Sequence, residues 1–442
     1  MLKVILTALT MTRAGDGLPV KSPTEVGMSS TRLNAIERVV ERGIKAGGYP
    51  GASVIVGRKG AAVFEKGFGK LSWSESSTAV DAQRTIYDIA SLSKVVGTTT
   101  AIMILYDENK IRLDDPVVNY IPTFGGGDKD QVTIRQLLTH TSGLPAGRDI
   151  WRIAQTPLEA RALVLNTPLE GRPGAQYIYS DLGADVLGLL IEVVSGEPLD
   201  KFLTRRVFEP LGMNETMYRP ADSLRYRIAP TEVTPPRGYP LRGEVHDENA
   251  YALGGVAGHA GLFSTAADFS VFAQMMLNGG EYNGVQIISK PTVELFTSRA
   301  FGHRALGWDT AEGDYGSGRY LGPTAYGHTG FTGTSMWIDP EREMFVILLT
   351  NRVHAARALR PAKVISDVRA DLSDAAVLSV LDGPKLTAGS KAFRADREVG
   401  WNPPPRASRR RHGSSRHHSI ASATSKSRSG TAKKKKSSKK SH

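Results

Sequence analysis

The hydrophobic residues of this chain follow strand-like spacing near both ends and mostly helix-like spacing between them. Apolar runs at 52–56 and 61–68 are separated by a short glycine-containing turn, which predicts a β-hairpin. Strand-like runs return at 327–339 and 344–350, and the second is too continuously apolar to lie at the edge of a sheet. The two ends of the chain therefore predict one antiparallel sheet.

Segments with helical spacing flank and interrupt these strands. A capped amphipathic stretch predicts a helix over residues 33–45, and a long apolar segment after residue 88 predicts a buried helix. Further helices are predicted at 131–138, 181–194, 266–277, 290–296 and 361–372. This order predicts an α+β fold, in which an antiparallel β-sheet is flanked by helices and carries an inserted, mainly helical lobe.

Chain length and charge distribution predict the domain organisation. The 442 residues carry a formal net charge of +12, but the last 37, from Arg406 onward, hold 13 of the 56 lysines and arginines and no acidic residue. The remainder has 43 basic and 44 acidic residues, so it gives no sign of binding a polyanion. We expect a domain over 25–380, with a sheet lobe at about 28–88 and 300–375 and a helical lobe at about 89–250.

The two ends of the chain are expected to lie outside this domain. Residues 1–24 begin with a short apolar run that resembles a residual signal peptide, but no clean cleavage site follows, so a disordered start is the alternative. Residues 381–442 are expected to form a linker and a disordered basic tail. The tail could bind anionic polymer, lipid or nucleic acid non-specifically, or it could have no dedicated partner. No stretch is apolar for long enough to form a transmembrane helix.

Ser91 and Lys94 stand at the start of the long apolar segment and are candidates for nucleophilic catalysis. Residues three apart share one face of a helix, so the Ser91 hydroxyl and the Lys94 amine should lie side by side. Asp88 is the predicted N-cap of this helix. A serine needs a base to take its proton, and we expect burial to lower the pKa of Lys94 for that purpose. A Ser-x-x-Lys spacing occurs by chance in most long chains, so the alternative interpretation is a surface pair without a function.

Two further motifs carry groups that suit the same chemistry. Tyr179, in the stretch Tyr179-Ser180-Asp181, could share the proton transfer or could be a half-buried structural tyrosine. His328-Thr329-Gly330 lies in a strand-like run and is followed by Phe331, whose backbone N–H could donate to an oxyanion. The alternative interpretation of the second motif is a glycine-rich bend.

The order and spacing of these three motifs resemble the serine β-lactamase and penicillin-binding protein-like superfamily. The tyrosine lies 88 residues after Ser91, and His-Thr-Gly lies near the C-terminal strands. Within the superfamily the chain resembles the class C β-lactamase-related branch, which includes esterases and D-alanyl-D-alanine peptidases. Residues 137–145, 254–258 and 261–265 fit that branch as well, and the resemblance covers about residues 25–375. It implies a β-lactamase/transpeptidase-like fold and favours an extracytoplasmic location, while the incomplete signal peptide leaves a cytoplasmic one open.

The resemblance also implies a serine hydrolase that works through an acyl-enzyme at Ser91. Lys94 and Tyr179 would form the general base system, and the backbone N–H groups of Ser91 and Phe331 would form the oxyanion hole. The substrate would be a small molecule or peptide, either an ester or a D-amino-acid peptide or amide. Loops such as 143–160 and 219–262 would set its selectivity.

The substrate-binding residues that the resemblance implies are Asp181, His328, Thr329 and Gly330, and two of them depart from the common pattern. Many members of the superfamily have Asn where this chain has Asp181, and many have Lys where it has His328. An ionised carboxylate only accepts hydrogen bonds and would repel a substrate carboxylate, although it could instead pair with Lys94. A neutral His328 would place a weaker field on Tyr179 than a lysine would.

These departures leave other functions open. The main alternative is a catalytically inactive relative that binds a wall peptide, and a weaker one is a β-lactamase. The intact set of Ser91, Lys94 and Tyr179 favours the hydrolase. No cofactor is expected, and no metal site is expected because His140, His246 and His259 lack the spacing of known metal motifs.

Overall fold

The computed structural model describes residues 17–311, 316–354, 362–386 and 393–401. Residues 1–16 of the predicted N-terminal segment, and the part of the predicted tail from residue 402 onward, lie outside the described residues. None of the helices in the described ranges combines the length and the apolar character that spanning a bilayer requires. The boundaries between the sheet lobe and the helical lobe are not tested and stay a prediction.

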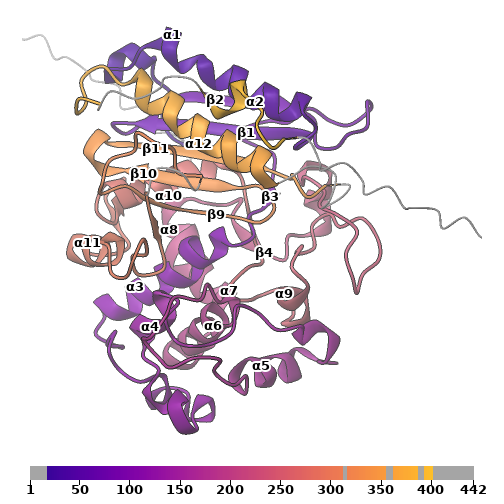
Figure 1. Ribbon diagram of the computed structural model, residues 1–442, viewed down its shortest axis with the longest axis vertical. Helices are drawn as coiled ribbons and strands as arrows, with labels where there is room; N and C mark the ends of the chain where they lie inside the picture. The colour runs from indigo at the N-terminus through magenta and orange to yellow at the C-terminus, as the bar shows by residue number, and fades with distance from the viewer. Residues whose placement is uncertain (1–16, 312–315, 355–361, 387–392, 402–442) are drawn as a thin grey trace, which may run out of the picture. The chain divides into compact units, whose positions relative to one another are not determined.

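A six-stranded antiparallel sheet forms the centre of the described chain, with the strand order β2-β1-β11-β10-β9-β8 (Figure 1). Its strands are β1 (Gly51–Arg58), β2 (Ala61–Gly69), β8 (Asp309–Thr310), β9 (Tyr326–Thr329), β10 (Ser335–Asp339) and β11 (Met344–Thr350). β11 lies between β1 and β10, which confirms that the most apolar run is an inner strand. The predicted run 327–339 is two strands rather than one, because a turn closed by the Gly330 N–H and the Thr334 carbonyl at 2.8 Å separates them.

Helices cover both faces of this sheet (Figure 1). On one face lie α1 (Ser30–Leu33), α2 (Ala35–Lys45) and α12 (Ala362–Ser379), and on the other lies α10 (Ala266–Leu277). Side chains of a strand point alternately to opposite faces. Val346 and Leu348 accordingly join the core under α12, whereas Ile347 and Leu349 join the second core. Burial on both faces explains the apolar sequence of β11.

The second core continues into the helical part of the chain. Its helices are α3 (Thr100–Asp107), α4 (Ile134–Leu138), α5 (Pro157–Leu165), α6 (Asp181–Ser195), α7 (Leu199–Leu203), α8 (Glu209–Leu211), α9 (Glu248–Ala252) and α11 (Lys290–Thr297). Two small sheets accompany them, β3-β5-β4 (Tyr87–Asp88, Leu262–Ser264 and Met217–Tyr218) and β6-β7 (Glu281–Tyr282 and Val285–Gln286). The 3-10 helices are η1 (Pro23–Val26), η3 (Val117–Asn119), η4 (Pro122–Phe124), η5 (Gly127–Gln131), η6 (Ile150–Arg152), η8 (Asp222–Arg227), η9 (Pro340–Arg342) and η10 (Arg394–Asp396), and η2 (Lys94–Thr99) and η7 (Thr204–Phe208) are π-helical.

The predicted α+β fold is confirmed, with differences at individual helix ends. The helix predicted from residue 131 begins at Ile134, because Thr133 caps it by accepting a hydrogen bond from the Gln136 N–H. The closing helix α12 runs on to Ser379, past its predicted end. The helix predicted at 181–194 matches α6, which ends where Gly196 adopts a left-handed conformation.

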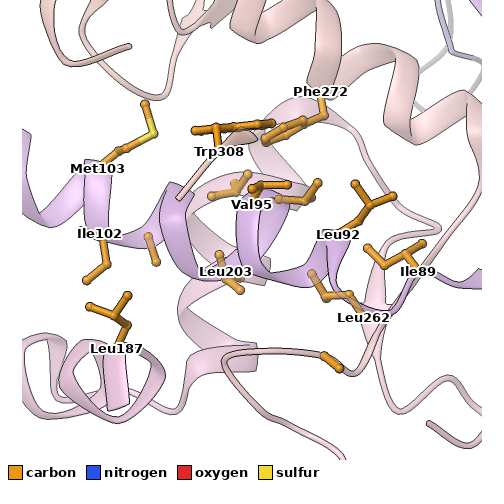
Figure 2. Close-up of a cluster of buried hydrophobic side chains, with 14 of the residues drawn as sticks. Ile89, Leu92, Val95, Ile102, Met103, Leu187, Leu203, Leu262, Phe272 and Trp308 are labelled. Carbon is orange, nitrogen blue, oxygen red and sulfur yellow. The ribbon is translucent and has the colours of Figure 1, made fainter. Parts of the chain in front are cut away.

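The helix predicted after residue 88 passes through the interior as η2 followed by α3. Its own apolar side chains, such as Val95 and Ile102, belong to one buried cluster with Trp308 and Leu187 of neighbouring segments (Figure 2). Phe272 stacks on Trp308, with the ring centroids 6.4 Å apart. This packing fixes the helix whose first turn follows Ser91.

Candidate active site

Ser91 lies at the bend between strand β3 and the helix η2. The preceding residue, Ala90, has a φ of 47°, a left-handed conformation that costs a residue with a side chain roughly 1–3 kcal/mol. The Asp88 carboxylate stabilises this bend by accepting hydrogen bonds from the Ala90 N–H at 2.8 Å and the His246 N–H at 2.7 Å. The prediction that Asp88 caps the helix is therefore wrong, because its carboxylate is already engaged at the bend.

Lys94 is buried directly behind Ser91. Its Nζ donates a hydrogen bond to Ser91 Oγ at 3.0 Å and another to the His259 carbonyl at 3.1 Å. The same nitrogen forms an ion pair with Asp181 Oδ1 at 2.7 Å. The angles at this contact do not meet those of a hydrogen bond. Burial disfavours the charge, but Asp181 and Tyr179 outweigh it and raise the pKa of Lys94 above its usual value. The prediction of a lowered pKa is wrong, because the Asp181 carboxylate lies against the amine.

Tyr179 stands beside this pair because the start of α6 is firmly held. Ser180 caps α6 by accepting the Gly183 N–H at 3.2 Å, and its hydroxyl donates to the Pro145 carbonyl at 2.6 Å. The Tyr179 ring centroid lies 5.0 Å from Lys94 Nζ and 4.5 Å from the centroid of the His140 ring. Burial lowers the pKa of His140 well below its usual value, so Lys94 rather than His140 is the cation at this contact.

The predicted motif His328-Thr329-Gly330 lies at the end of β9, and side chains of the turn that follows bind it to the Ser91 bend. The Thr332 hydroxyl donates to the Asp88 carbonyl at 2.8 Å, and the Thr334 hydroxyl donates to the Ile89 carbonyl at 3.0 Å. A Cβ atom at Gly330 would lie only 2.4 Å from the Ile89 oxygen, so this approach requires glycine. Phe331, 47% exposed, therefore lies on a turn that is attached to the Ser91 bend.

His328 is neutral in this environment. Its Nδ1–H donates to the Thr329 carbonyl at 2.8 Å. Nε2 is buried, has no hydrogen-bond partner among the residues that the structure describes, and lies 3.9 Å from Asp309 Oδ2. Burial, aided by the Arg304 and Lys94 cations, lowers the pKa of His328 to about 4, against the opposing effect of Asp309.

One cavity of about 700 Å³ brings most of the predicted residues together. Its lining includes Ser91, Tyr179, His328, Thr329, Gly330 and Phe331. Lys94 and Asp181 are not in the lining; Lys94 contacts the lining residue Ser91, and Asp181 contacts Lys94. Another cavity of about 730 Å³ holds none of the predicted site residues, and residues of the loops 143–160 and 219–262 line it. We place the candidate active site in the first cavity, because it contains the serine.

The sequence interpretation missed the charged residues Arg304, Asp309, Arg352 and Arg369 in the same cavity. Arg304 is fully buried, pairs closely with Asp309 and places its guanidinium carbon 5.8 Å from the Tyr179 ring centroid. Arg369 projects from α12 and donates to the carbonyls of Gly330 and Thr334. None of these residues belongs to a short motif, so the sequence offered no spacing that could reveal them.

His259 lies behind Lys94, whose Nζ donates to its carbonyl, and in the sequence it suggested only a metal ligand. Its Nδ1 lies 2.7 Å from Asp185 Oδ1 and its Nε2 lies 2.9 Å from Asp247 Oδ1. Burial disfavours the charged ring, but the two carboxylates outweigh it and raise the pKa of His259 well above its usual value. In the part of the chain that the structure describes, no group of three or more potential ligand side chains is arranged to hold a metal ion.

Comparisons with known proteins agree with this architecture. A family model described as Beta-lactamase matches residues 36–369, which is more than half of the chain. A protein of Escherichia coli (strain K12) named "Putative D-alanyl-D-alanine carboxypeptidase" is 33% identical over 397 residues, which cover 80% of this chain and 91% of that protein.

Two solved structures share the fold. A penicillin-binding protein homologue from Caulobacter crescentus superposes with a TM-score of 0.63 at 22% identity, over 80% of this chain and 99% of that one. A class C beta-lactamase superposes with a TM-score of 0.65 at 17% identity, over 80% and 98% of the two chains. At these identities the structures show a common fold and nothing finer.

Proposed function

Because the chain belongs to the beta-lactamase family, whose members include serine hydrolases, we propose that it cleaves D-alanyl peptides by acyl transfer to Ser91. The observation that carries the proposal is the 3.0 Å hydrogen bond between Lys94 Nζ and Ser91 Oγ beside a cavity large enough for a peptide end. The name of the Escherichia coli relative favours a peptide over an ester as the substrate.

The proposed acylation step assigns the proton transfer to Tyr179. Lys94 keeps its proton at neutral pH because its pKa is raised, so it acts as a cation that stabilises negative charge on the Tyr179 oxygen. In the reactive form of the site, from which the Tyr179 proton has been released to solvent, that oxygen takes the proton of Ser91, and Oγ forms a bond to the peptide carbonyl carbon while the carbonyl oxygen becomes negative. The backbone N–H groups of Ser91 and Phe331 donate to this oxyanion.

Collapse of the tetrahedral intermediate completes the transfer. The C–N bond breaks, the proton on Tyr179 passes to the leaving amine, and the acyl group remains as an ester on Ser91. Water then gives a proton to Tyr179 and attacks the ester carbon. The bond between that carbon and Ser91 Oγ breaks, Oγ takes the proton back from Tyr179, and the acyl group leaves as a carboxylic acid. In this proposal Asp181 holds Lys94, with its charge balanced by the amine 2.7 Å away.

The test compares the purified protein with Ser91→Ala on N-acyl-D-alanyl-D-alanine, p-nitrophenyl butyrate and a chromogenic cephalosporin. Mass spectrometry reports any acyl group that remains on the protein. We expect peptide turnover and an adduct that both depend on Ser91. Serine-dependent turnover of the ester or the cephalosporin alone would replace the peptidase by an esterase or a β-lactamase. No adduct with any of the three would favour the inactive wall-peptide binding protein.

The basic tail is a separate part of the proposal, based on its 13 lysines and arginines without an acidic residue. We propose that it adsorbs to anionic polymer or lipid by releasing counterions. A truncation after Trp401 is the suitable variant, because the Trp401 side chain is buried and donates to Asp367 at 2.8 Å. Turnover should stay unchanged, while salt-sensitive retention on heparin should be lost. Retention that survives truncation would place the binding elsewhere.

A further inference from the structure

The segment from His246 to His259, which includes α9, supports the candidate nucleophile and its amine partner. At its start, the His246 N–H donates at 2.7 Å to Asp88, whose carboxylate also stabilises the bend that carries the nucleophile. At its end, the His259 carbonyl accepts a hydrogen bond from Lys94 Nζ at 3.1 Å. The bend and the amine are therefore each held by one end of the same segment.

Glycines give the backbone of this segment little stiffness of its own. It contains Gly254, Gly255 and Gly258, and φ is 87° at the first of these and 81° at the second. Glycine has more conformational freedom than any other residue. Lysine adds freedom of its own, because its amine is carried on a flexible four-carbon stem. Other contacts must therefore fix where the His259 carbonyl and the Lys94 amine lie.

The ring of His259 supplies such contacts. Its Nδ1–H donates to Asp185 of α6 at 2.7 Å, and its Nε2–H donates to Asp247 at 2.9 Å. Both nitrogens donate at once only when the ring is charged. Burial disfavours that form, but the two carboxylates outweigh it and raise the pKa of His259 well above its usual value. Asp247 follows His246 in the chain, so its bond to the ring joins the two ends of the segment and fixes their separation.

Packing against α6 and η2 holds the neighbouring backbone. A Cβ atom at Gly258 would lie 1.9 Å from the Ala184 carbonyl oxygen, so the chain passes directly over α6. The Thr98 hydroxyl of η2 donates to the Gly258 carbonyl at 2.6 Å. Loss of the His259 ring would leave these contacts in place and release the next residue, whose carbonyl binds Lys94. The ring is therefore the contact that acts on the lysine anchor itself.

We propose that His259 is a positioning residue for Lys94, because its ring fixes the carbonyl that anchors the Lys94 amine beside Ser91. This inference rests on the proposed acyl transfer at Ser91 and adds to it a residue outside the lining of the cavity. Asp181 attracts the same amine as an ion pair at 2.7 Å. A hydrogen bond constrains direction as well as distance. The bond to the His259 carbonyl therefore keeps the amine 3.0 Å from Ser91 Oγ against the pull of Asp181.

The test measures acylation of Ser91 and substrate binding separately, by single-turnover kinetics with N-acyl-D-alanyl-D-alanine. His259→Gln should lower the acylation rate roughly tenfold to hundredfold, the loss that follows a displacement of about 1 Å. The substrate Kd should stay unchanged, because neither His259 nor Lys94 lines the cavity. Asp247→Asn should cause a smaller loss, since asparagine still caps α9 but lacks the charge that holds the ring.

A double-mutant cycle separates positioning from a purely structural role. If His259 acts through Lys94, His259→Gln should lower the acylation rate by less than about twofold once Lys94→Met is present. If its role is only structural, the two losses multiply and the inference is overturned.

Arg342→Met is the matched control, because it breaks another buried ion pair, with Asp339 at 2.8 Å. Neither of these two residues lines the cavity. The variant should lower the melting temperature and leave the acylation rate, measured well below that temperature, unchanged.

A measurement without turnover keeps this inference separate from the proposed function. Brief exposure to acetic anhydride, followed by peptide mass spectrometry, compares acetylation of the buried Lys94 with that of the exposed Lys290. We expect the ratio to rise in His259→Gln, because the released amine becomes accessible, and to stay unchanged in Arg342→Met.

The outcomes decide the two proposals independently. A wild-type acylation rate in His259→Gln overturns the positioning role and leaves the hydrolase standing. If wild type forms no acyl-enzyme, the proposed function fails and acetylation alone decides: a higher Lys94 ratio in the variant supports positioning, and an equal ratio overturns it. If His259→Gln does not fold, Asp247→Asn gives the same decision.

Discussion

Tyr179 lies between two flanks that are built from similar parts but differ in charge. On the helical flank, Lys94 pairs with Asp181, and its Nζ lies 5.0 Å from the tyrosine ring centroid. On the sheet flank, Arg304 pairs with Asp309, and its guanidinium carbon lies 5.8 Å from the same centroid. Each flank also buries a histidine. The His259 ring on the helical flank is charged, whereas the His328 ring on the sheet flank is neutral.

Local partners explain this difference. Two carboxylates contact the ring of His259 on the helical flank and raise its pKa well above the usual value. No carboxylate of the described residues contacts the buried ring of His328 on the sheet flank, since Asp309 is 3.9 Å away, and burial lowers the pKa of His328 to about 4. The two flanks teach that the charge of a buried histidine depends on what its nitrogens touch, and that residue type alone does not predict it.

Removing the cation of the helical flank should have the largest effect. Lys94→Met leaves Ser91 Oγ and Asp181 without their amine partner, so kcat should fall by roughly 10²–10⁴-fold, the range for lost proton-transfer assistance. The measurement is turnover of the best substrate, with circular dichroism to confirm folding. Tyr179→Phe should cause a loss of similar size, and a loss below tenfold in both variants would contradict the assigned roles.

Removing the charged histidine of the helical flank should next affect stability. His259→Gln leaves Asp185 and Asp247 facing each other without a cation, so the free energy of unfolding should fall by about 3–5 kcal/mol. Because the folded pKa of His259 is raised, its contribution is fully present below the unfolded value near 6.5 and declines as pH rises through the folded pKa. Urea unfolding from pH 5.5 to 9 should therefore show the largest gap between wild type and variant at the acid end. A gap that widens with rising pH would overturn this account.

Removing the cation of the sheet flank should cost less than removing Lys94. Arg304→Met should lower kcat by roughly tenfold, because Asp309 offsets much of the Arg304 charge at the Tyr179 ring. Adding His328→Lys to this variant should restore part of the loss, since it returns a cation to the same side of the tyrosine. Steady-state kinetics of the single and double variants check this, and a double variant slower than the single one would contradict a role through charge.

The neutral histidine of the sheet flank should give the smallest effect, confined to acid pH. Its folded pKa is lowered to about 4, so the stability associated with neutral His328 is present above about 6.5 and is lost as pH falls toward 4. The slope of the unfolding free energy against pH reports how many more protons the unfolded state binds than the folded state. In this window His328→Gln should lower that number by up to one. His140 stays in both proteins and contributes equally to both slopes. An unchanged slope would show that another group titrates there.

The general fold could be predicted from the sequence because its signals are local or repetitive. The apolar run of β11 and the capped, glycine-terminated helix α6 carry their boundaries in neighbouring residues. The start of the Ser91 helix was missed because Asp88 binds a backbone N–H from His246, far away in the chain. No local pattern reports such a contact.

The features of the candidate site also fall into two groups, those that local motifs reveal and those that depend on contacts between distant segments. Ser91, Tyr179 and His328 could be found through motif order, and the structure lines one cavity with all three. The direction in which the pKa of Lys94 shifts could not be predicted, because it depends on whether the Asp181 carboxylate reaches the amine. Arg304 and Arg369 were also beyond prediction, since their relation to Ser91 exists only after β9 and α12 have packed.

The threonine hydroxyls that join the turn after β9 to the Ser91 bend have a mechanical consequence. Thr332 and Thr334 bind the carbonyls of residues 88 and 89, so two hydrogen bonds join the turn that carries Phe331 to the bend that carries Ser91. Arg369 of α12 also donates to the carbonyls of Gly330 and Thr334, so helix α12 is attached to the same turn. Any change in the width of the cavity is therefore expected at the segment around Tyr179 rather than at α12. The spacing between the two proposed oxyanion donors is therefore expected to be the same with and without a bound substrate.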